Sequence, residues 1–246
     1  MIINVKNSMS FIRRKIHNIT HPVLGRILML HRVVEHRSEG ENRELEITPD
    51  FLEQTIETYR RQGQRFVPID EACEIIVRSR TDHPFVCLTF DDGYQDNYDI
   101  AYPILKQMNV PFAIYVTTGF IDNRLPMWWY PDQQLGLGFE ELRALDREPL
   151  CTIGAHTVNH PRLDTFSNEK QRKEILESKN ILESILGHSV NHFSYPHGAY
   201  NDETLSIIRD YGFHTALMAW GGSIRRGANS LLLPRIELKQ PCNTNV

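Results

Sequence analysis

The stretch FVCLTFDDGYQDNYDIAYPILKQM, residues 85–108, joins a short apolar run to a longer helical pattern. Its first six residues, Phe85–Phe90, predict a buried β-strand, and residues 95–108 predict a helix. A strand followed by a crossover helix is the repeating unit of parallel sheets, so this stretch predicts one β–α unit. Two carboxylates, Asp91 and Asp92, follow directly at the point where the strand ends.

The same alternation of strand and helix patterns continues along the rest of the chain. Further strands are predicted at residues 27–31, 65–69, 111–117, 150–155, 191–195, 214–218 and 231–236. Further helices are predicted at residues 49–61, 71–78, 167–186 and 202–211. Regular alternation is typical of a parallel sheet with crossover helices. Because no repeat or linker interrupts it, we expect a basic leader over residues 1–26 and a single α/β domain over residues 27–246.

Composition and charge exclude several classes of protein. The chain has 246 residues, of which 41% are hydrophobic and 24% charged, so it is not a disordered or fibrous chain. Its net charge of −4 disfavours nucleic acid as a partner. No apolar run approaches the roughly 20 residues that a membrane-spanning helix needs. The first residues lack the apolar core of a secretory signal, so we expect a cytoplasmic protein.

The basic leader suggests a second location for the protein. Residues 1–37 contain seven lysines and arginines but one acidic residue. Within residues 9–20, the isoleucines Ile12, Ile16 and Ile19 recur at helical spacing beside a cluster of basic side chains. This pattern predicts peripheral contact with the anionic inner face of a membrane, where a lipid-linked sugar would be within reach. The alternative is a basic helix that is solvated or packed on the domain.

Polar side chains follow the ends of several predicted strands. They include His31, the pair Asp91 and Asp92, His156, and the segment 195–197. In parallel α/β folds the carboxyl ends of the strands form the active site. Clusters at four strand ends are typical of the mouth of a barrel.

Two of these clusters predict a metal site. Adjacent carboxylates such as Asp91 and Asp92 repel each other unless one of them binds a cation. His156 and His160 are four residues apart, and on a helical turn this spacing places both rings on one face. Asp92 with the two histidines would be the three-ligand set of an open catalytic zinc site. The alternatives are an aspartate-based turn and a chance pair of histidines. The glutamate of the H-E-x-x-H motif is missing, which argues against a zinc protease.

Together these motifs resemble those of a known family. They are TFDDG at Thr89–Gly93, H-T-x-x-H at His156–His160 and Y-P-x-G at Tyr195–Gly198. Their order and spacing, from about residue 27 to residue 238, are similar to the polysaccharide deacetylases of the NodB-homology type, carbohydrate esterase family 4. The segments LHRV at residues 30–33 and LPRI at residues 233–236 resemble the subgroup of poly-N-acetylglucosamine deacetylases.

The resemblance implies a single-domain distorted (β/α)7 TIM-like barrel that removes acetyl groups from N-acetylated sugars of a polysaccharide or glycan intermediate. It implies that Asp91 is the general base and that Asp92, His156 and His160 bind one divalent ion. That ion would be Zn²⁺, although Co²⁺, Ni²⁺ or Fe²⁺ suit the same ligands. The backbone N–H of His197 would match the donor that stabilises the oxyanion.

The chain departs from the family pattern at the proton donor. Many members carry an arginine in the third motif and a histidine in a closing L-x-H motif. Here the third motif, residues 193–198, has no arginine, and residues 231–235 have no histidine. We therefore name His31 as the first candidate for the general acid and His197 as the second; the alternative for His31 is a capping histidine that hydrogen-bonds at the strand end. Arg235 is too basic to donate a proton but could orient Asp91 or a substrate group.

Aromatic residues near the predicted strand ends are candidates for sugar binding. The substrate-binding candidates are Tyr94, Tyr195, Pro196, Trp220 and Arg235. Residues 127–130, MWWY, could form a further aromatic platform. Packing is the alternative for residues 127–130 and for Trp220, and capping of a helix is the alternative for Tyr94.

Two other functions remain open at this point. The same metal site could serve an O-acetyl esterase or a hydrolase of another amide, since an ester needs less help from a general acid. The barrel could also be a carbohydrate-binding pseudoenzyme that lacks the acid. The intact set Asp91, Asp92, His156 and His160 argues against the pseudoenzyme. No P-loop, G-x-G-x-x-G or G-x-S-x-G motif supports a nucleotide-dependent enzyme or a serine hydrolase.

Overall fold

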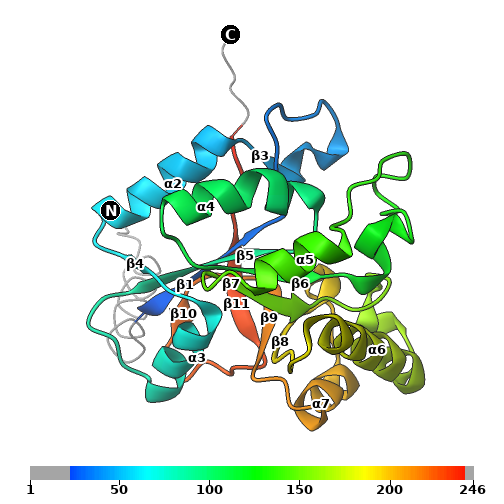
Figure 1. The fold of residues 1–246 in the computed structure, drawn as a ribbon. Coiled ribbons are helices and arrows are strands. Elements are labelled where there is room, and N and C mark those ends of the chain that lie inside the picture. The colour runs from blue at the N-terminus through cyan, green and yellow to red at the C-terminus, as the bar shows by residue number, and fades with distance from the viewer. Residues whose placement is uncertain (1–22, 242–246) are drawn as a thin grey trace, which may run out of the picture.

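The computed structural model describes residues 23–241, and within this range seven parallel strands close into a barrel (Figure 1). Strand β1 closes the ring because it pairs in parallel with both β5 and β11. The barrel strands are β1 (Val23–Leu30), β5 (Phe85–Phe90), β6 (Phe112–Val116), β7 (Cys151–Ala155), β8 (His192–Ser194), β9 (Thr215–Gly221) and β11 (Leu233–Glu237). The prediction of a (β/α)7 TIM-like barrel is therefore confirmed.

Shorter strands lie at the margins of the barrel. Strand β4 (Arg65–Phe66) extends the sheet in parallel beside β5, and β10 (Ile224–Arg225) pairs antiparallel with β1. Strands β2 (Arg32–Val33) and β3 (Glu46–Ile47) pair with each other in a small separate sheet. In the chain, β2 precedes and β3 follows the 3-10 helix η1 (Glu41–Leu45). Their pairing therefore holds together the two ends of the segment that follows β1.

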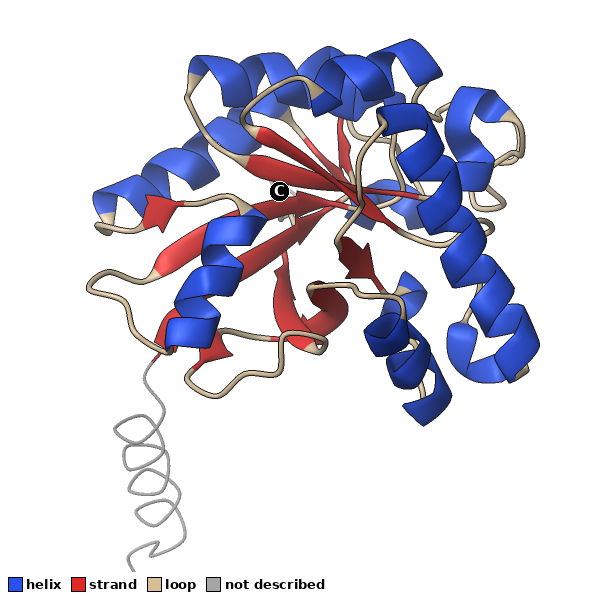
Figure 2. Cartoon of the chain, turned by 60° about the horizontal axis from the view of Figure 1, so that its bottom comes forward, coloured by secondary structure: helices blue, strands red, loops and turns tan. Residues whose placement is uncertain are grey.

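Helices surround the barrel, as Figure 2 shows. They are α2 (Pro49–Arg61), α3 (Ile69–Arg78), α4 (Tyr102–Gln107), α5 (Phe139–Asp146), α6 (Asn168–Leu186) and α7 (Asp202–Asp210). The side chains of β5 explain the layering, since neighbours on a strand point to opposite faces. Val86, Leu88 and Phe90 pack in the core beneath the helices, whereas Phe85 and Cys87 pack inside the barrel. Both faces of β5 are thus buried, as expected of a parallel strand.

Helix α3 closes the amino-terminal end of the barrel. Its buried residues Ile69, Ala72 and Ile76 belong to the same apolar cluster as the interior residues Tyr115 and Leu217. Apolar side chains therefore fill the barrel interior at its amino-terminal end. The mouth at the carboxyl ends of the strands is left to polar side chains.

The structure differs from the sequence-based expectations in several elements. The strand predicted over residues 65–69 is only β4, and Ile69 already begins α3. Strand β1 begins at Val23, four residues before the predicted strand start. The helix predicted over residues 95–108 is divided into the π-helical turn η2 (Asn97–Ala101) and α4. Pro103 follows this turn, and a proline cannot donate the backbone hydrogen bond that a continuous α-helix needs. Helix α5 was not predicted at all.

The predicted leader lies almost wholly outside the described residues, so the proposed membrane contact of residues 9–20 and the leader boundary stay predictions. No helix within residues 23–241 is long and apolar enough to cross a membrane.

Candidate metal centre and active site

Asp91 and Asp92 sit at the barrel mouth because the backbone changes direction directly after β5. The backbone N–H of Asp91 donates to the carbonyl of Leu30, 3.0 Å away, which extends the strand pairing by one residue. Asp92 then adopts a left-handed conformation with φ 74°, and Gly93 follows with φ 80°. Two neighbours that would point to opposite faces of a strand are thereby both buried at the mouth, each 3% exposed.

His156 and His160 are brought together by a loop, and the predicted helical turn is wrong. Strand β7 ends at Ala155, and residues 156–160 contain no helix. Thr157 and His160 both have positive φ, 65° and 57°, which a helical turn does not allow. This folded loop still places the two imidazole rings 4.9 Å apart. The four-residue spacing therefore predicted correctly that the two rings lie close together, but it predicted the wrong backbone conformation.

Asp92, His156 and His160 form a group that fits a metal ion. Oδ1 of Asp92 lies 3.5 Å from Nε2 of His156 and 3.3 Å from Nε2 of His160. One potential ligand atom from each of the three residues lies within 4.8 Å of the other two. Oδ1 of Asp92 is buried and has no hydrogen-bond partner. An unpaired buried carboxylate oxygen is costly, and a cation between the three ligands would satisfy it.

The hydrogen bonding of His156 and the neutral state of His160 suit metal binding. Nδ1 of His156 lies 2.8 Å from the carbonyl of Ser194, so this nitrogen donates and Nε2 faces Asp92 as the atom that would bind a metal. Burial lowers the pKa of His156, but Asp91 and Asp92 more than offset this and raise it. Burial lowers the pKa of His160 to about 3, against the attraction of Asp92. His160 is therefore a neutral ligand.

Asp91 does not share this ligand group but is held by Arg235. The guanidinium of Arg235 donates to both carboxylate oxygens of Asp91, at 2.7 and 2.6 Å. Ser194 donates its hydroxyl to Asp91 at 3.2 Å and accepts from Arg235 at 2.8 Å. Burial raises the pKa of Asp91, yet Arg235 and His156 outweigh burial and hold it below the ordinary value. Asp91 is thus a buried, ionised carboxylate beside the metal ligands.

Arg235 was predicted either to orient Asp91 or to bind substrate, and the structure places it on Asp91. Its side chain is fully buried, and Nε donates to the carbonyl of Met218 at 2.7 Å. Both terminal nitrogens donate to Asp91, and one also donates to Thr89, so the guanidinium is fixed in the barrel interior.

The polar centre opens into a cleft of about 730 Å³. Asp91, Asp92 and His160 form its floor, and both candidate proton donors, His31 and His197, line it. The ring of His197 lies 4.5 Å from that of His160, and burial lowers its pKa. His31 directly follows β1, and its backbone carbonyl accepts from the Asn97 amide at 2.8 Å.

Two exposed tryptophans line the same cleft. Trp128 is 62% exposed and Trp220 is 60% exposed, which is rare for side chains of this size. Trp129 differs from its neighbour, since its ring packs 4.9 Å from His160 and its Nε1 donates to the hydroxyl of Tyr94 at 2.6 Å. Of the predicted platform at residues 127–130, Trp128 therefore offers the open face.

The other substrate-binding candidates are buried around the cleft. Tyr94 is 0% exposed and accepts the hydrogen bond from Trp129. Tyr195 is also 0% exposed, and its hydroxyl donates to the carbonyl of Leu231 at 2.9 Å. Pro196 is buried and begins the short 3-10 helix η5 (Pro196–Gly198). Of these three residues, Tyr195 is the one that lines the cleft, and the hydroxyls of Tyr94 and Tyr195 are used in hydrogen bonds within the protein.

Ser194 and Glu174 support the centre, although the sequence predicted no role for either residue. Ser194 contacts Asp91 and Arg235 through its hydroxyl and His156 through its carbonyl. Glu174 accepts hydrogen bonds from the loop that carries both histidines. A signal for Glu174 was available, because it shares a buried helical face with Gln171, Ile175 and Leu182. An acidic residue on such a face needs a partner.

Comparison with known proteins identifies the family. A model of the polysaccharide deacetylase family matches residues 78–216, which is more than half of the chain. The chain therefore belongs to the polysaccharide deacetylase family.

Individual relatives are similar over different lengths. The Bacillus subtilis protein YxkH is 25% identical over 175 residues, covering 71% of this chain and 59% of that protein. The chain thus spans less than two thirds of this relative. The poly-beta-1,6-N-acetyl-D-glucosamine N-deacetylase of Staphylococcus aureus is 22% identical over 213 residues, covering 81% of this chain and 70% of that enzyme. The structure of Streptococcus pyogenes deacetylase PplD in complex with acetate is 27% identical with a TM-score of 0.76, covering 89% and 93% of the two chains.

Proposed function

We propose that this protein is a metal-dependent hydrolase that removes acetyl groups from N-acetylated sugars of a polysaccharide or glycan intermediate. The observation that carries the proposal is the pairing of two distinct aspartates at the barrel mouth. Asp92 completes a metal-ligand group with an unpaired buried oxygen, whereas Asp91 stays outside that group, ionised and adjacent to it. Membership of the polysaccharide deacetylase family supports the same chemistry.

Asp92, His156 and His160 would hold the ion, and Zn²⁺ is the ion that we propose, since nitrogen and carboxylate ligands in an open three-ligand site suit it. Co²⁺, Ni²⁺ or Fe²⁺ would fit the same ligands. Bound there, a divalent ion would supply a Lewis acid that can polarise an amide carbonyl and lower the pKa of water.

Asp91 is proposed as the general base. Its Oδ2 lies 3.9 Å from Nε2 of His156, so the carboxylate borders the space that the ligands enclose. The Arg235 guanidinium keeps Asp91 ionised and fixes its plane by two hydrogen bonds. Asp91 can therefore accept a proton from attacking water without first losing one. The backbone N–H of His197, at the start of η5, is proposed to stabilise the oxyanion.

His31 is proposed as the general acid that protonates the leaving amine. It lines the cleft together with Asp91 and Asp92. The lowered pKa of His197 and its packing against His160 make it the weaker candidate. An imidazolium must hold a proton near neutral pH to act as an acid.

The exposed faces of Trp128 and Trp220 are proposed to bind the glycan. Flat aromatic faces suit the apolar C–H faces of pyranose rings, and both tryptophans line the cleft. The S. aureus relative is named for poly-beta-1,6-N-acetyl-D-glucosamine, which makes N-acetylglucosamine oligomers the first substrates to test. A Trp220→Ala variant should raise KM for an oligomer and leave the zinc content unchanged.

The proposed function is tested by acetate release from N-acetylglucosamine oligomers and from O-acetylated sugars. Zinc-loaded protein should release acetate from the oligomers, whereas chelated protein and the Asp91→Asn variant should not. Release from the O-acetylated sugars alone would favour an esterase, to which the absence of a histidine in residues 231–235 lends support. No release from either class by zinc-loaded protein would contradict the proposal.

We also propose that the protein works in the cytoplasm, with residues 9–20 in peripheral contact with the inner face of the membrane, where a lipid-linked sugar would be presented. The support is the amphipathic pattern of Ile12, Ile16 and Ile19 beside basic residues. The full chain should co-sediment with vesicles that contain anionic lipid, and a chain lacking residues 1–20 should not. Equal co-sedimentation of the two chains would contradict the contact.

A further inference from the structure

Helix α6 buries an acidic side chain, Glu174, on its inner face. Glu174 is 8% exposed and lies in line with Gln171, Ile175, Ser178 and Leu182, which are also buried. A carboxylate in such surroundings is costly unless hydrogen bonds satisfy it. The hydrogen-bond partners of Glu174 therefore indicate its role.

All three hydrogen bonds described for Glu174 come from the loop between the two histidines. Oε2 accepts from the backbone N–H groups of Val158 and Asn159, at 3.0 and 2.9 Å. Oε1 accepts from the side-chain amide of Asn159 at 2.7 Å. The carboxylate thus binds the middle of a loop whose first and last residues are His156 and His160.

The opposite side of the loop is held by the segment that follows β6. The N–H groups of Thr118 and Gly119 donate to the carbonyls of Thr157 and Val158, at 3.0 and 2.8 Å. The approach is so close that a Cβ on Gly119 would lie 2.5 Å from the Val158 oxygen. Glu174 takes the N–H groups of the loop while the β6 side takes its carbonyls, so the loop is clamped from both faces.

His160 depends on this clamp more than His156 does. The ring of His156 is oriented by its own hydrogen bond to Ser194. Nδ1 of His160 is buried without a hydrogen-bond partner, so no acceptor orients its ring in the same way. Its position follows from the backbone, which is left-handed at His160 itself, and from packing against the aromatic rings around it.

We propose that Glu174 is a positioning residue for the metal centre, which it serves by fixing the loop that presents His160. The inference rests on the metal site of the proposed function. A glutamine at this position keeps the shape and the helix propensity of Glu174. In glutamine one carboxylate oxygen becomes an NH₂ donor, and the remaining oxygen is a weaker acceptor. Glutamine therefore cannot accept all three hydrogen bonds as the carboxylate does.

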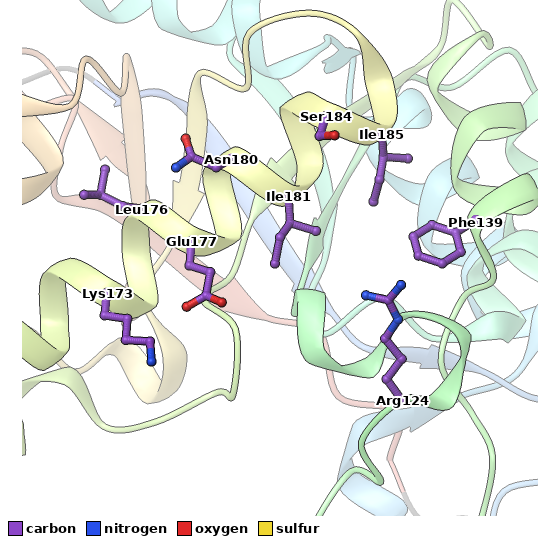
Figure 3. A pocket seen from close by; sticks show the side chains of 9 residues that line it. All are labelled: Arg124, Phe139, Lys173, Leu176, Glu177, Asn180, Ile181, Ser184 and Ile185. Atoms are coloured by element: carbon purple, nitrogen blue, oxygen red, sulfur yellow. The ribbon is translucent and has the colours of Figure 1, made fainter.

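The test compares Glu174→Gln with Glu177→Gln in the full chain. Glu177 lies about one turn further along α6, but its side chain is exposed and lines an outer groove with Arg124 and Phe139 (Figure 3). Zinc affinity is measured by competition with a chromophoric chelator, and folding is followed by circular dichroism. Loss of a group that orients metal ligands typically weakens affinity about 10–100-fold, and we expect this for Glu174→Gln. Glu177→Gln should match the wild-type affinity.

A cobalt-loaded sample gives a second readout, because its visible absorption reports the ligand geometry. We expect an altered spectrum for Glu174→Gln and a wild-type spectrum for Glu177→Gln. If Glu174→Gln lowers the melting temperature but leaves zinc affinity and the cobalt spectrum unchanged, its role is merely structural and the inference is overturned. If the wild-type protein itself binds no zinc, the proposed metal site fails instead.

Asn159→Ala serves if Glu174→Gln does not fold. Asn159 is exposed, and the substitution removes one hydrogen bond to Glu174 without emptying the core. We expect zinc to bind more weakly to this variant than to the wild type, by less than the full effect of Glu174→Gln. Wild-type affinity in a folded Asn159→Ala variant, with Glu174→Gln unfolded, would overturn the inference.

Discussion

Each end of the barrel interior holds a buried histidine beside a carboxylate, but the two ends use these groups differently. At the amino-terminal end, Nε2 of His192 lies 3.1 Å from Asp70 of α3, and Nδ1 lies 2.8 Å from the hydroxyl of Thr215. At the mouth, Nδ1 of His156 is likewise bonded, but Nε2 lies 3.5 Å from Asp92, whose Oδ1 has no hydrogen-bond partner.

The difference separates a structural polar contact from a binding centre. Both ring nitrogens of His192 are satisfied within the protein, so nothing further is needed there. The group at the mouth holds acceptors with no donor between them, which is the arrangement that a cation completes. Both histidines are buried, but Asp70 is exposed and hydrogen-bonded, whereas Asp92 is buried with an unsatisfied oxygen, and this oxygen makes the distinction.

The largest expected effect separates the two histidines. His156→Ala should abolish zinc binding and deacetylation, and zinc should no longer raise its melting temperature. His192→Ala should keep both zinc and activity but lose about 2–4 kcal/mol of unfolding free energy, through a cavity and unpaired polar groups. Zinc content by mass spectrometry and denaturant unfolding check the pair. Loss of zinc from a folded His192→Ala variant would break the comparison.

Asp91→Asn should affect both activity and stability. Removing a general base slows catalysis by about 10²–10⁴-fold, and we expect this in kcat with zinc content unchanged. The change also leaves the buried guanidinium of Arg235 without its counter-charge, which typically costs about 3–5 kcal/mol. Single-turnover kinetics and denaturant unfolding measure the two effects. A variant with wild-type kcat would exclude Asp91 as the base.

His31→Ala should have a narrower effect on catalysis. If His31 protonates the leaving amine, the variant loses activity toward an N-acetyl sugar by about 10²-fold or more. The same variant should keep most of its activity toward 4-nitrophenyl acetate, whose leaving group needs no proton. The contrast is measured as kcat/KM for the two substrates, and His197→Ala is measured in the same way because His197 is the second candidate. Equal losses on amide and ester would rule out the role of general acid.

The smallest expected effect is at the amino-terminal end and depends on pH. The hydrogen bond from His192 lowers the pKa of Asp70, so its contribution to stability is present above the ordinary aspartate pKa and disappears as pH falls through the lowered one. The side chain of Asp70 is 65% exposed, so solvent screening limits the contribution to about 1 kcal/mol or less. The stability difference between wild type and Asp70→Asn should therefore shrink on acidification. A difference that grows in acid would show the opposite sign of coupling.

Local patterns predicted most of the fold correctly. Strand β5 and helix α2 have the predicted boundaries, because a buried apolar run and a proline at the first helical turn are strong local signals. The division of residues 95–108 and the presence of α5 were missed. Closure of the ring by β1 and β5, which are more than 50 residues apart in the chain, is a long-range pairing that no local pattern contains.

Local patterns likewise predicted only part of the candidate site. The sequence named Asp91, Asp92, His156 and His160 as a group, because these residue types recur at strand ends with the spacing of a known family. It described residues 156–160 as a helical turn, whereas the structure has a loop with left-handed residues. It left Arg235 between two roles, and the bidentate contact with Asp91 settles where its guanidinium lies.

The sequence by itself determined which chemical groups this protein has and at which strand ends they occur, because strand and helix periodicity and short motifs are local properties. Tertiary structure alone decided which of these groups meet, since contacts such as Asp91 with Arg235 and Glu174 with Val158 depend on closing the barrel and packing α6 against it. The physical reason is that an unpaired or satisfied polar atom is defined by its neighbours in space, and these come from distant parts of the chain.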